Sequence, residues 1–241
     1  MLKKGVGFIV ICLAGVGAGG CGLAYYQPYP LVRAVQKIVP DIVFFVPTDS
    51  SFFALTFDDG PNPPYTDRVL EILSRHEARS TFFVTGRQVE RYPQYLDRFR
   101  QEGHQVANHL YLDRPTIDLS SEELLESLNR TESLIAGHAE KRYFRPAGGL
   151  ISPEQLKLVK EREYEVVLGS AYVSDPHDPP RFIMLENLKT MLRPGIIIVL
   201  HDGGGYRQKT VDILDELLQY AAERGLAPVT VDELIESRAP K

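Results

Sequence analysis

The sequence predicts an α/β fold in which a parallel sheet or barrel is covered by helices. From residue 51 onward, short runs rich in β-branched and aromatic residues alternate with longer runs of helical periodicity. Repeated alternation of strand and helix favours parallel strands that are joined by right-handed crossovers. A chain of 241 residues with 44% hydrophobic residues is long enough for one domain of barrel size with a large core.

The expected elements follow from these local patterns. Strands are expected at residues 53–57, 81–84, 105–108, 142–144, 165–168, 196–200 and 228–231. Helices are expected at residues 66–76, 121–135, 153–162, 184–192 and 210–223. Ser120, with Glu123 three positions later, provides a capping box that starts the second of these helices. Because the active site of a parallel barrel forms where its strands end, polar clusters directly after a strand are the candidate functional residues.

Residues 1–26 form a predicted export signal or membrane anchor. Lys3 and Lys4 precede an uncharged, apolar run at residues 5–26, a pattern that directs export and keeps the lysines in the cytoplasm. Three outcomes stay open: an uncleaved anchor of spanning length, cleavage after Ala24, or lipidation at Cys21. In each of them the protein is exported and its catalytic domain lies outside the cytoplasm. An anchor would make the membrane a partner through residues 5–26.

Residues 27–50 are expected to be either a linker or a segment wrapped on the domain. Aromatic and proline residues at 25–30 favour an extended spacer near the membrane interface, and residues 31–39 form a short amphipathic piece. The apolar run at 42–46 fits a wrap packed on the domain equally well. We assign the catalytic domain to residues 51–241.

Charge and cysteine content limit the class of protein. A formal net charge of -5 argues against a nucleic-acid partner, because binding nucleic acid requires a basic face that neutralises phosphates. Both cysteines, Cys12 and Cys21, precede residue 51. The predicted catalytic domain therefore contains no disulfide bond.

Two adjacent carboxylates, Asp58 and Asp59, end the first expected strand and precede Gly60. Adjacent carboxylates repel each other, so a compensating charge is expected close by. A divalent metal ion bound by one carboxylate, with the other left free as a general base, would supply that charge. A solvated Asp-Asp-Gly-Pro turn is the alternative that this motif alone leaves open.

His109 and Asp113 follow the third expected strand with a spacing of four residues. One helical turn would place them on the same side, where an imidazole and a carboxylate can supply two metal ligands and Asp59 a third. A surface hydrogen bond between the two side chains is the alternative. His104 begins the same strand with opposite parity to His109, so a structural hydrogen bond is its expected role.

Three further side chains follow later strands. Arg145, after the fourth strand, can fix the ionised form and the orientation of Asp58, while the glycine turn at 148–149 can offer backbone N–H groups to an oxyanion. His201 follows the apolar strand 196–200 directly, which suits a general acid. A carboxylate such as Asp175 would hold its tautomer and raise its pKa.

The ordered motifs of this chain resemble the polysaccharide deacetylase family, carbohydrate esterase family 4. The resemblance rests on TFDDGP, GHQVANH with a carboxylate four residues on, FRPAGG, VLGS with a later aspartate, and IIIVLHDG followed by Arg207 and Thr210. It covers residues 51–237. It implies a distorted (β/α)7 barrel, preceded here by the N-terminal signal or anchor. It also implies hydrolysis of acetyl groups on sugars with one divalent metal ion, for which zinc is expected first and manganese, iron or cobalt are alternatives.

The resemblance also implies a role for each candidate residue. The implied roles are Asp58 as general base, Asp59 and His109 as metal ligands, Arg145 as the group that orients Asp58, His201 as general acid, and Asp175 as the residue that tunes His201.

Three positions depart from the family pattern. Asp113 stands where the family usually has a second histidine ligand, and an added carboxylate favours harder ions such as Mn²⁺ or Fe²⁺ relative to Zn²⁺. Gly148 replaces an aromatic residue of the sugar site, and Pro176 replaces the usual tryptophan. Because the chain has no tryptophan, the acetyl pocket must be lined differently, with Tyr172 or Leu200 as candidates.

These motifs predict a metal-dependent N-deacetylase that acts on N-acetylglucosamine units of a cell-surface or extracellular glycan. Peptidoglycan, a chitin-like oligomer and an exopolysaccharide all fit. An O-acetyl esterase acting on a xylan-like polysaccharide is a second enzymatic interpretation, because the same machinery cleaves both bonds. A catalytically weak glycan-binding protein is a third, but an inert binder has no chemical need for both a base and an acid.

Overall fold

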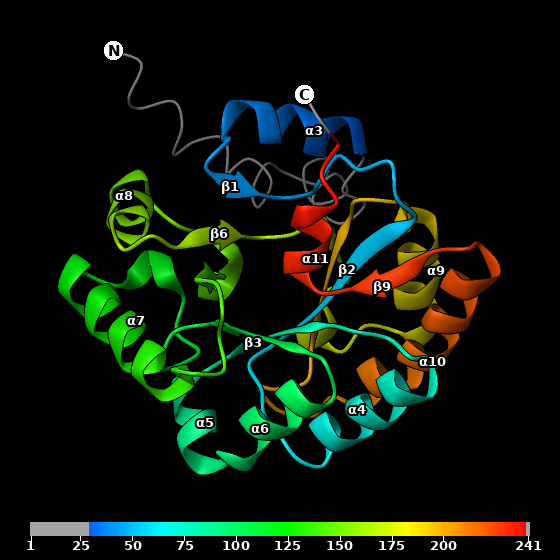
Figure 1. The fold of residues 1–241 in the computed structure, drawn as a ribbon, viewed down its shortest axis with the longest axis horizontal. Coiled ribbons are helices and arrows are strands. Elements are labelled where there is room, and N and C mark those ends of the chain that lie inside the picture. The colour runs from blue at the N-terminus through cyan, green and yellow to red at the C-terminus, as the bar shows by residue number, and fades with distance from the viewer. Residues whose placement is uncertain (1–28, 240–241) are drawn as a thin grey trace.

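The computed structural model describes residues 29–239, which form a curved parallel sheet wrapped by helices (Figure 1). All of the paired strands run parallel to one another. The strands of the described residues are β1 (Ile42–Val43), β2 (Phe52–Asp58), β3 (Thr81–Val84), β4 (Gln105–Asn108), β5 (Tyr143–Phe144), β6 (Glu165–Val167), β7 (Ala171–Tyr172), β8 (Ile197–His201) and β9 (Ala227–Val229). The predicted α/β class with parallel strands is confirmed.

The helices form a ring outside the strands, in which Figure 1 shows α7, α5, α6, α4, α10 and α9 in turn. The α-helices of the described residues are α3 (Tyr29–Ile38), α4 (Tyr65–Arg75), α5 (Gly86–Arg91), α6 (Gln94–Gln101), α7 (Ser121–Ile135), α8 (Pro153–Glu161), α9 (Arg181–Met191), α10 (Gln208–Glu223) and α11 (Val231–Glu236). Three short 3-10 turns, η1 (Thr116–Asp118), η2 (Ala147–Gly149) and η3 (Asp175–His177), lie in the loops that follow β4, β5 and β7.

The long periodic segments of the sequence predict the elements well. Strands β3 and β4 and helix α7 have the expected bounds, and the capping box of Ser120 and Glu123 is formed. Sequence analysis missed β1, β7, α5, α6 and α11. The two missed strands have two residues each and the three missed helices have six to eight, which is too short for a period to be recognised.

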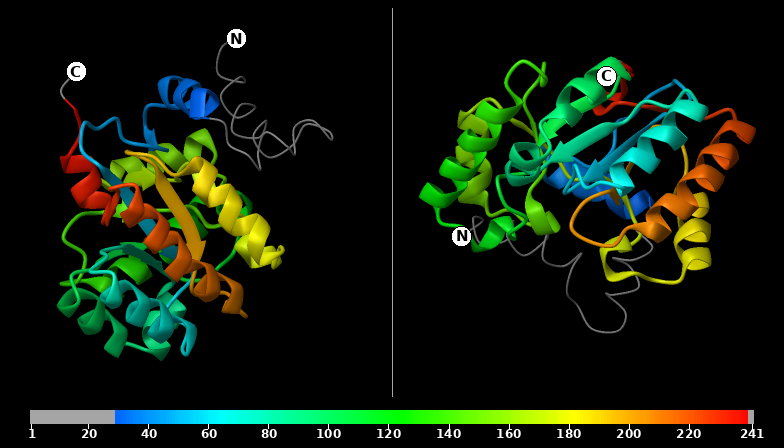
Figure 2. Two further views of the ribbon diagram at one scale, coloured as in Figure 1. Left: turned by 90° about the vertical axis from the view of Figure 1, so that its right-hand side faces the viewer. Right: turned by 90° about the horizontal axis from the view of Figure 1, so that it is seen from below.

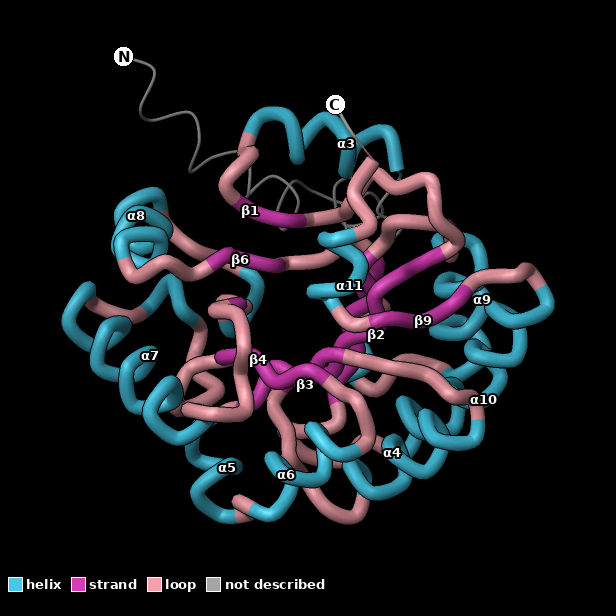
Figure 3. The backbone as a smooth tube through the Cα atoms, in the orientation of Figure 1, coloured by secondary structure: helices cyan, strands magenta, loops and turns pink. Residues whose placement is uncertain are grey.

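The sheet is strongly curved, and its strands surround the centre of the molecule (Figure 3). The strand order is β1-β6-β5-β4-β3-β2-β8-β7, with β9 pairing with the start of β2. The residues directly after β1 form backbone contacts with the residues directly before β8, so they connect the β1 edge of the sheet to the start of β8. Phe45 forms an antiparallel bridge with Ile196, and the Val46 N–H donates to the Gly195 carbonyl at 2.8 Å.

Side chains along the strands alternate between an outer core under the helices and the interior of the curved sheet, where the site lies. On β2, Phe53, Leu55 and Phe57 belong to the core that lies under the helices. Ala54 belongs to a separate cluster with β3, β4 and β8 residues inside the curl, which α11 also joins. Because side chains of one strand alternate between faces, Thr56 and Asp58 point to this interior as well.

The segment before β2 packs on the sheet. Helix α3 contributes Val32 and Val35 to a core cluster that includes Phe45, and the Tyr29 ring contacts the Phe45 ring with centroids 5.4 Å apart. The Gln36 side-chain amide donates to the Ile42 carbonyl at 2.8 Å. The predicted amphipathic piece at residues 31–39 largely coincides with α3, which buries its apolar face here. The extended spacer expected at residues 25–30 is helical where the structure describes it, at Tyr29 and Pro30. The alternative for residues 42–46, a wrap on the domain, is the observed arrangement.

The described ends of the chain lie near each other. The side view in Figure 2 shows α3 at the end of the molecule from which β8 begins. The C-terminal segment returns to this end, where the Ala239 N–H donates to the Pro47 carbonyl at 2.9 Å. Among residues 29–239 there is no helix with the length and apolarity needed to cross a membrane. The predicted signal or anchor, residues 1–26, lies outside the described part of the chain.

Candidate active site

Asp58 and Arg145 form a buried ion pair at the end of β2. Nη1 of Arg145 lies 2.6 Å from Oδ1 of Asp58, and both side chains are less than 5% exposed. The same Nη1 donates to the Thr56 hydroxyl at 2.7 Å, and Nε donates to the Val167 carbonyl at 3.1 Å. The guanidinium also lies 3.9 Å from the centroid of the Phe83 ring. These contacts hold Asp58 in one orientation and compensate its charge.

The turn that follows Asp58 is locked by the loop after β8. Asp59 has a left-handed backbone conformation with φ 70°. A Cβ on Gly203 would lie 2.0 Å from the Asp59 carbonyl carbon, and a Cβ on Gly60 would lie 2.4 Å from Oδ2 of Asp202. Both positions therefore require glycine, because Gly203 packs on the Asp59 backbone and Gly60 packs on the buried Asp202 carboxylate. This contact fixes the direction in which the Asp59 carboxylate points.

Asp59, His109 and Asp113 converge, as the sequence predicts. One ligand atom from each residue lies within 4.8 Å of the other two. Nδ1 of His109 lies 2.8 Å from the Arg145 carbonyl oxygen, so this nitrogen is the donor and Nε2 is directed to Asp59, with its Oδ1 3.3 Å away. Asp59 and His109 are buried, whereas Asp113 is exposed. The cluster is thus open on one side.

The residues of this cluster fit a divalent metal ion. Oδ1 of Asp59 is buried without a hydrogen-bond partner, although the His109 ring is near it. Burial and the neighbouring Asp59 carboxylate raise the pKa of Asp113, because two negative charges so close together repel each other. A cation between the two carboxylates would offset this repulsion and give Oδ1 of Asp59 a partner. One imidazole and two carboxylates are a donor set that divalent transition metals accept.

The loop that carries His109 and Asp113 is fastened at Tyr111. The Tyr111 hydroxyl donates to Glu90 at 2.8 Å and accepts from Arg130 at 2.8 Å, and the Arg130 guanidinium lies 3.5 Å from the Tyr111 ring centroid. Leu110, between His109 and Tyr111, is fully buried with φ 68°, an uncommon conformation for a leucine. The surrounding contacts stabilise this conformation, which turns the chain back toward Asp59.

His201 and Asp175 form the second buried pair of the site. Nδ1 of His201 lies 2.8 Å from Oδ1 of Asp175, whose Oδ2 accepts from the His201 backbone N–H at 2.7 Å and from the Thr210 hydroxyl at 2.9 Å. Burial alone lowers the pKa of His201. The Asp175 carboxylate, with Asp58 and Asp59 farther away, outweighs burial and raises that pKa to about 9. His201 therefore carries a proton at neutral pH.

His104 lies outside the cluster, as its parity predicts. Its ring is buried against Phe82, with centroids 5.4 Å apart, and Nδ1 lies 3.4 Å from the Ser80 hydroxyl. Burial lowers the pKa of His104 to about 4, with Arg98 adding a smaller effect. It is a neutral core residue.

Sequence analysis missed a buried carboxylate directly after His201. Asp202 has no exposed surface, and its Oδ2 accepts a short hydrogen bond from the Thr66 hydroxyl. Burial raises the pKa of Asp202 to about 7, opposed by the bond from Thr66. The Asn62 amide donates to the Asp202 carbonyl at 3.1 Å. Asp202 belongs to one of the sequence motifs, but no local sequence pattern indicates that it pairs with Thr66.

The structure places Gly148 and the two residues expected to line the acetyl pocket. Gly148 has φ 72°, and a Cβ there would lie 3.3 Å from Cβ of Pro115, so a proline occupies the adjacent space. The Gly149 N–H closes the turn on the Pro146 carbonyl at 3.0 Å, so this amide is engaged. Leu200 belongs to the outer core and does not line the site, which corrects one expectation. Tyr172 fits better, because its ring centroid lies 6.1 Å from that of His201.

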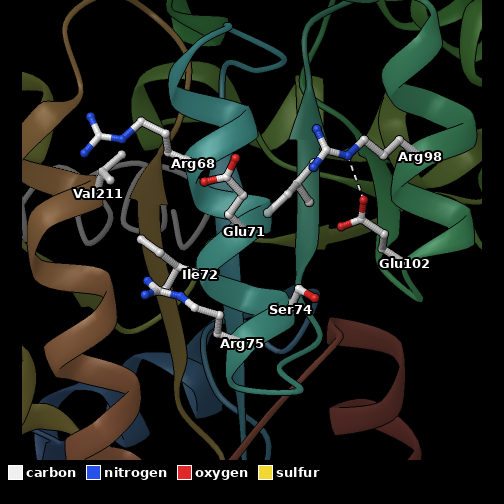
Figure 4. Close-up of a pocket in the computed structure, with 9 residues that line it drawn as sticks. Arg68, Glu71, Ile72, Ser74, Arg75, Arg98, Glu102 and Val211 are labelled. Carbon is white, nitrogen blue, oxygen red and sulfur yellow. Dashed lines mark hydrogen bonds and ion pairs between the residues drawn. The ribbon is translucent and has the colours of Figure 1, made fainter.

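A surface cavity of about 760 Å³ lies apart from these residues, on the outside of the helix ring. Figure 4 shows charged side chains around it, from α4, from α6 and from Glu102 directly after α6, and Arg98 and Glu102 are ion-paired. Its lining includes none of the predicted site residues. The site is built at the strand ends, as expected for a parallel sheet.

Comparison with known proteins agrees with the geometry. The family model described as polysaccharide deacetylase matches residues 46–167. A peptidoglycan-N-acetylglucosamine deacetylase of Bacillus cereus is 34% identical over 212 residues, which cover 85% of this chain and 98% of that protein. This chain belongs to the polysaccharide deacetylase family.

Other members of the polysaccharide deacetylase family extend the likeness. A chitooligosaccharide deacetylase of Sinorhizobium fredii is 33% identical, with 71% of this chain and 86% of that protein covered. Among solved structures, the Bc1960 peptidoglycan N-acetylglucosamine deacetylase aligns with a TM-score of 0.78 and 27% identity, covering 86% of this chain and 98% of that one. The fold of this family member is therefore shared with a solved deacetylase over most of its length.

Proposed function

We propose that this protein hydrolyses N-acetyl groups from N-acetylglucosamine units of a cell-surface or extracellular glycan. The observation that carries the proposal is the joint placement of two pairs, Asp58 with Arg145 and His201 with Asp175, around the convergent Asp59, His109 and Asp113. Peptidoglycan is the favoured glycan, because the relatives include two peptidoglycan-N-acetylglucosamine deacetylases that cover 85% and 80% of this chain. Chitin-like oligomers are the second candidate, after the chitooligosaccharide deacetylases.

The proposed base and acid act from two separate strand ends. Asp58 ends β2 with its orientation fixed by Arg145, so it can accept a proton from the attacking water. His201 ends β8 and is protonated at neutral pH, so it can donate a proton to the leaving amine. Asp175 holds Nδ1 of His201, which leaves Nε2 as the donating atom. The two roles require opposite protonation states, and the different partners of the two residues supply them.

The proposed metal ligands are Asp59, His109 and Asp113. A bound divalent ion supplies Lewis-acid chemistry, polarising the acetyl carbonyl and making water more acidic. The chain's own part is to hold the ligands: the Arg145 carbonyl fixes the tautomer of His109, and Gly203 packs against the Asp59 backbone. Zinc is the first candidate, and the second carboxylate makes manganese, iron or cobalt stronger competitors than a second histidine would.

The remaining features of the proposal concern the whole chain. We assign residues 51–241 to the catalytic domain and its curled sheet to the distorted (β/α)7 barrel of the family. Residues 1–26 are proposed to direct export and to tether the protein to a membrane, as an anchor or a lipoprotein. A domain outside the cytoplasm fits a cell-surface or extracellular glycan as substrate.

Acetate release tests the proposed function. Purified protein with added Zn²⁺ is expected to release acetate from peptidoglycan and from a chitooligosaccharide, and chelation is expected to abolish this release. An acetylated xylan tests the alternative O-acetyl esterase in the same assay. Release from xylan alone would assign the esterase activity, and glycan binding without any acetate release under metal-saturated conditions would assign a binding protein.

A further inference from the structure

Most of the large exposed apolar side chains of residues 29–239 lie in segments that follow strands of the site. Five large hydrophobic side chains are between 41% and 67% exposed: Ile38, Leu112, Ile117, Phe182 and Tyr206. All except Ile38 lie in segments that follow β4, β7 or β8, and we call these four the apolar rim. An exposed apolar side chain beside a functional site is a candidate for contact with the ligand, because folding otherwise buries such groups.

Tyr206 is the member of the apolar rim that has a structural connection to the candidate metal centre. It is 65% exposed and follows three glycines. Gly204 packs so closely on Asp59 that a Cβ there would lie 2.8 Å from the carboxylate Oδ2. The Asn62 side-chain amide donates to the Gly205 carbonyl at 2.9 Å, which holds the loop in place. The loop that carries Tyr206 is therefore fixed against a proposed metal ligand through Gly204, two residues before Tyr206.

Tyr65 supports the ring of Tyr206 from the start of α4. The two ring centroids are 5.8 Å apart with an interplanar angle of 78°, a favourable edge-to-face geometry. Tyr65 itself is half-buried and packs against the outer core, so it gives a rigid support. An exposed aromatic ring on a rigid support is complementary to the C–H face of a pyranose sugar, because the ring face is electron-rich and those hydrogens are electropositive.

We propose that Tyr206, supported by Tyr65, is a stacking site for a sugar ring of the glycan next to the one that is deacetylated. This inference rests on the proposed function for the identity of the glycan. The Tyr206 ring packs on Tyr65, which is none of the residues to which we assign chemistry. It therefore contributes to binding of oligomers and not to the chemical step, and its loss affects longer substrates selectively.

The test compares Tyr206→Ala and Tyr206→Phe with the unchanged protein. The probe is the β-1,4-linked tetramer of N-acetylglucosamine, with the monomer as a short substrate. Tyr206→Ala is expected to raise KM for the tetramer about tenfold with kcat within twofold, whereas the monomer is unaffected. Tyr206→Phe is expected to behave like the unchanged protein, because it keeps the ring. Ile38→Ala is the matched control, since Ile38 is similarly exposed but lies on α3.

A binding measurement separates this inference from the proposed function. Calorimetric titration of metal-free protein with the tetramer measures Kd without turnover, and Tyr206→Ala is expected to weaken it about tenfold as well. If the unchanged protein releases no acetate but shows this Tyr206-dependent Kd, the proposed function fails and the stacking site stands. If acetate is released but Tyr206→Ala leaves both KM and Kd unchanged, the stacking site is wrong. A fall in kcat at constant KM would also overturn it.

Discussion

Single side chains at the strand ends obtain their proposed roles from their hydrogen-bond partners. Asp58 and Asp175 are both buried carboxylates, but Asp58 faces an arginine that stays charged and Asp175 faces a histidine that can release its proton. Arg145 thus holds Asp58 in position as the proposed base, and Asp175 keeps His201 protonated as the proposed acid. Parity along each strand selects which residue enters the site, because His109 and not His104 faces the interior.

Kinetics of two variants test the base and the acid. Asp58→Asn and His201→Ala are each expected to lower turnover roughly 10²–10⁴-fold, the range for loss of one general catalyst. Neither residue belongs to the proposed ligand cluster, so both variants should bind one Zn²⁺ in a calorimetric titration. Asp59→Ala should lose that binding, because it removes a ligand whose Oδ1 has no other partner. Near-full activity of metal-saturated Asp58→Asn would reduce Asp58 to a turn residue.

The His201–Asp175 pair predicts a pH-dependent stability. The pKa of His201 is about 9 in the folded protein and near 6.5 in an unfolded chain, so the pair stabilises fully below about pH 6.5 and is lost as the pH rises through about 9. Asp175→Asn should lower the His201 pKa below 6.5, measured by NMR titration of metal-free protein. Urea unfolding should show a deficit of roughly 3 kcal/mol at pH 6 that shrinks by pH 9.5. An unchanged imidazole titration would contradict the assignment.

Sequence patterns revealed the strand-end residues but not the buried contacts behind them. Asp58, Asp59, His109, Arg145 and His201 each lie at the end of a predicted strand, so their position could be predicted. The bond between Thr66 and Asp202 joins residues 136 positions apart, and no local pattern reports such a pair. The same holds for Thr210, whose hydroxyl reaches Asp175 from the first turn of α10. Both hydrogen bonds join segments that are distant in sequence and become neighbours only in the folded protein.

At the scale of elements, the loop after β4 determines the geometry of the proposed metal ligands. It holds His109 and Asp113 on either side of a left-handed Leu110 and is fastened by Tyr111 to α5 and α7. Its Leu110 and Tyr111 carbonyls accept from the N–H groups of Gly86 and Arg87, at 2.9 and 3.0 Å. The spacing of His109 and Asp113 suggested a helical turn. The structure has instead an irregular loop, stabilised by contacts that are distant in sequence.

Removing the Tyr111 hydroxyl should weaken metal binding without changing the ligands. Tyr111→Phe loses the bonds to Glu90 and Arg130, so the loop can move and the ligand geometry is less well prepared. We expect the Zn²⁺ dissociation constant to rise about fivefold, because the lost bonds are solvent-exposed and each is weak. Tyr220→Phe is the matched control, since Arg224 likewise donates to the Tyr220 hydroxyl, at 3.3 Å on the outer helix α10. Equal affinity of the two variants would show that Tyr111 does not position the site.

At the scale of the whole molecule, the curled sheet brings the two proposed catalytic pairs together and α3 with β1 completes its wall. Asp58 and His201 are register partners on the adjacent strands β2 and β8, whereas Arg145 reaches Asp58 across the interior from the end of β5. Curvature is thus required for the Asp58–Arg145 pair. The alternation of strands and helices predicted the parallel sheet. It did not predict that residues 42–46 bridge from β6 to the start of β8, because no helix lies between β1 and β2 to reveal a repeat unit.

Phe45 tests whether the segment before β2 is part of the folded domain. Its side chain is 5% exposed, contacts Tyr29 and belongs to the core cluster that joins α3 to the sheet. If residues 42–46 complete the wall, Phe45→Ala should lower the free energy of unfolding by roughly 3 kcal/mol, as for a large buried aromatic side chain. Ile38→Ala, on the exposed face of α3, should change it by less than about 0.5 kcal/mol. Equilibrium urea denaturation of both variants measures the difference. Truncation of a core side chain leaves a cavity that the neighbouring residues fill only in part, which is why a large loss of stability is expected at Phe45. If Phe45→Ala lowers the free energy of unfolding no more than Ile38→Ala does, the segment lies on the surface without stabilising the sheet.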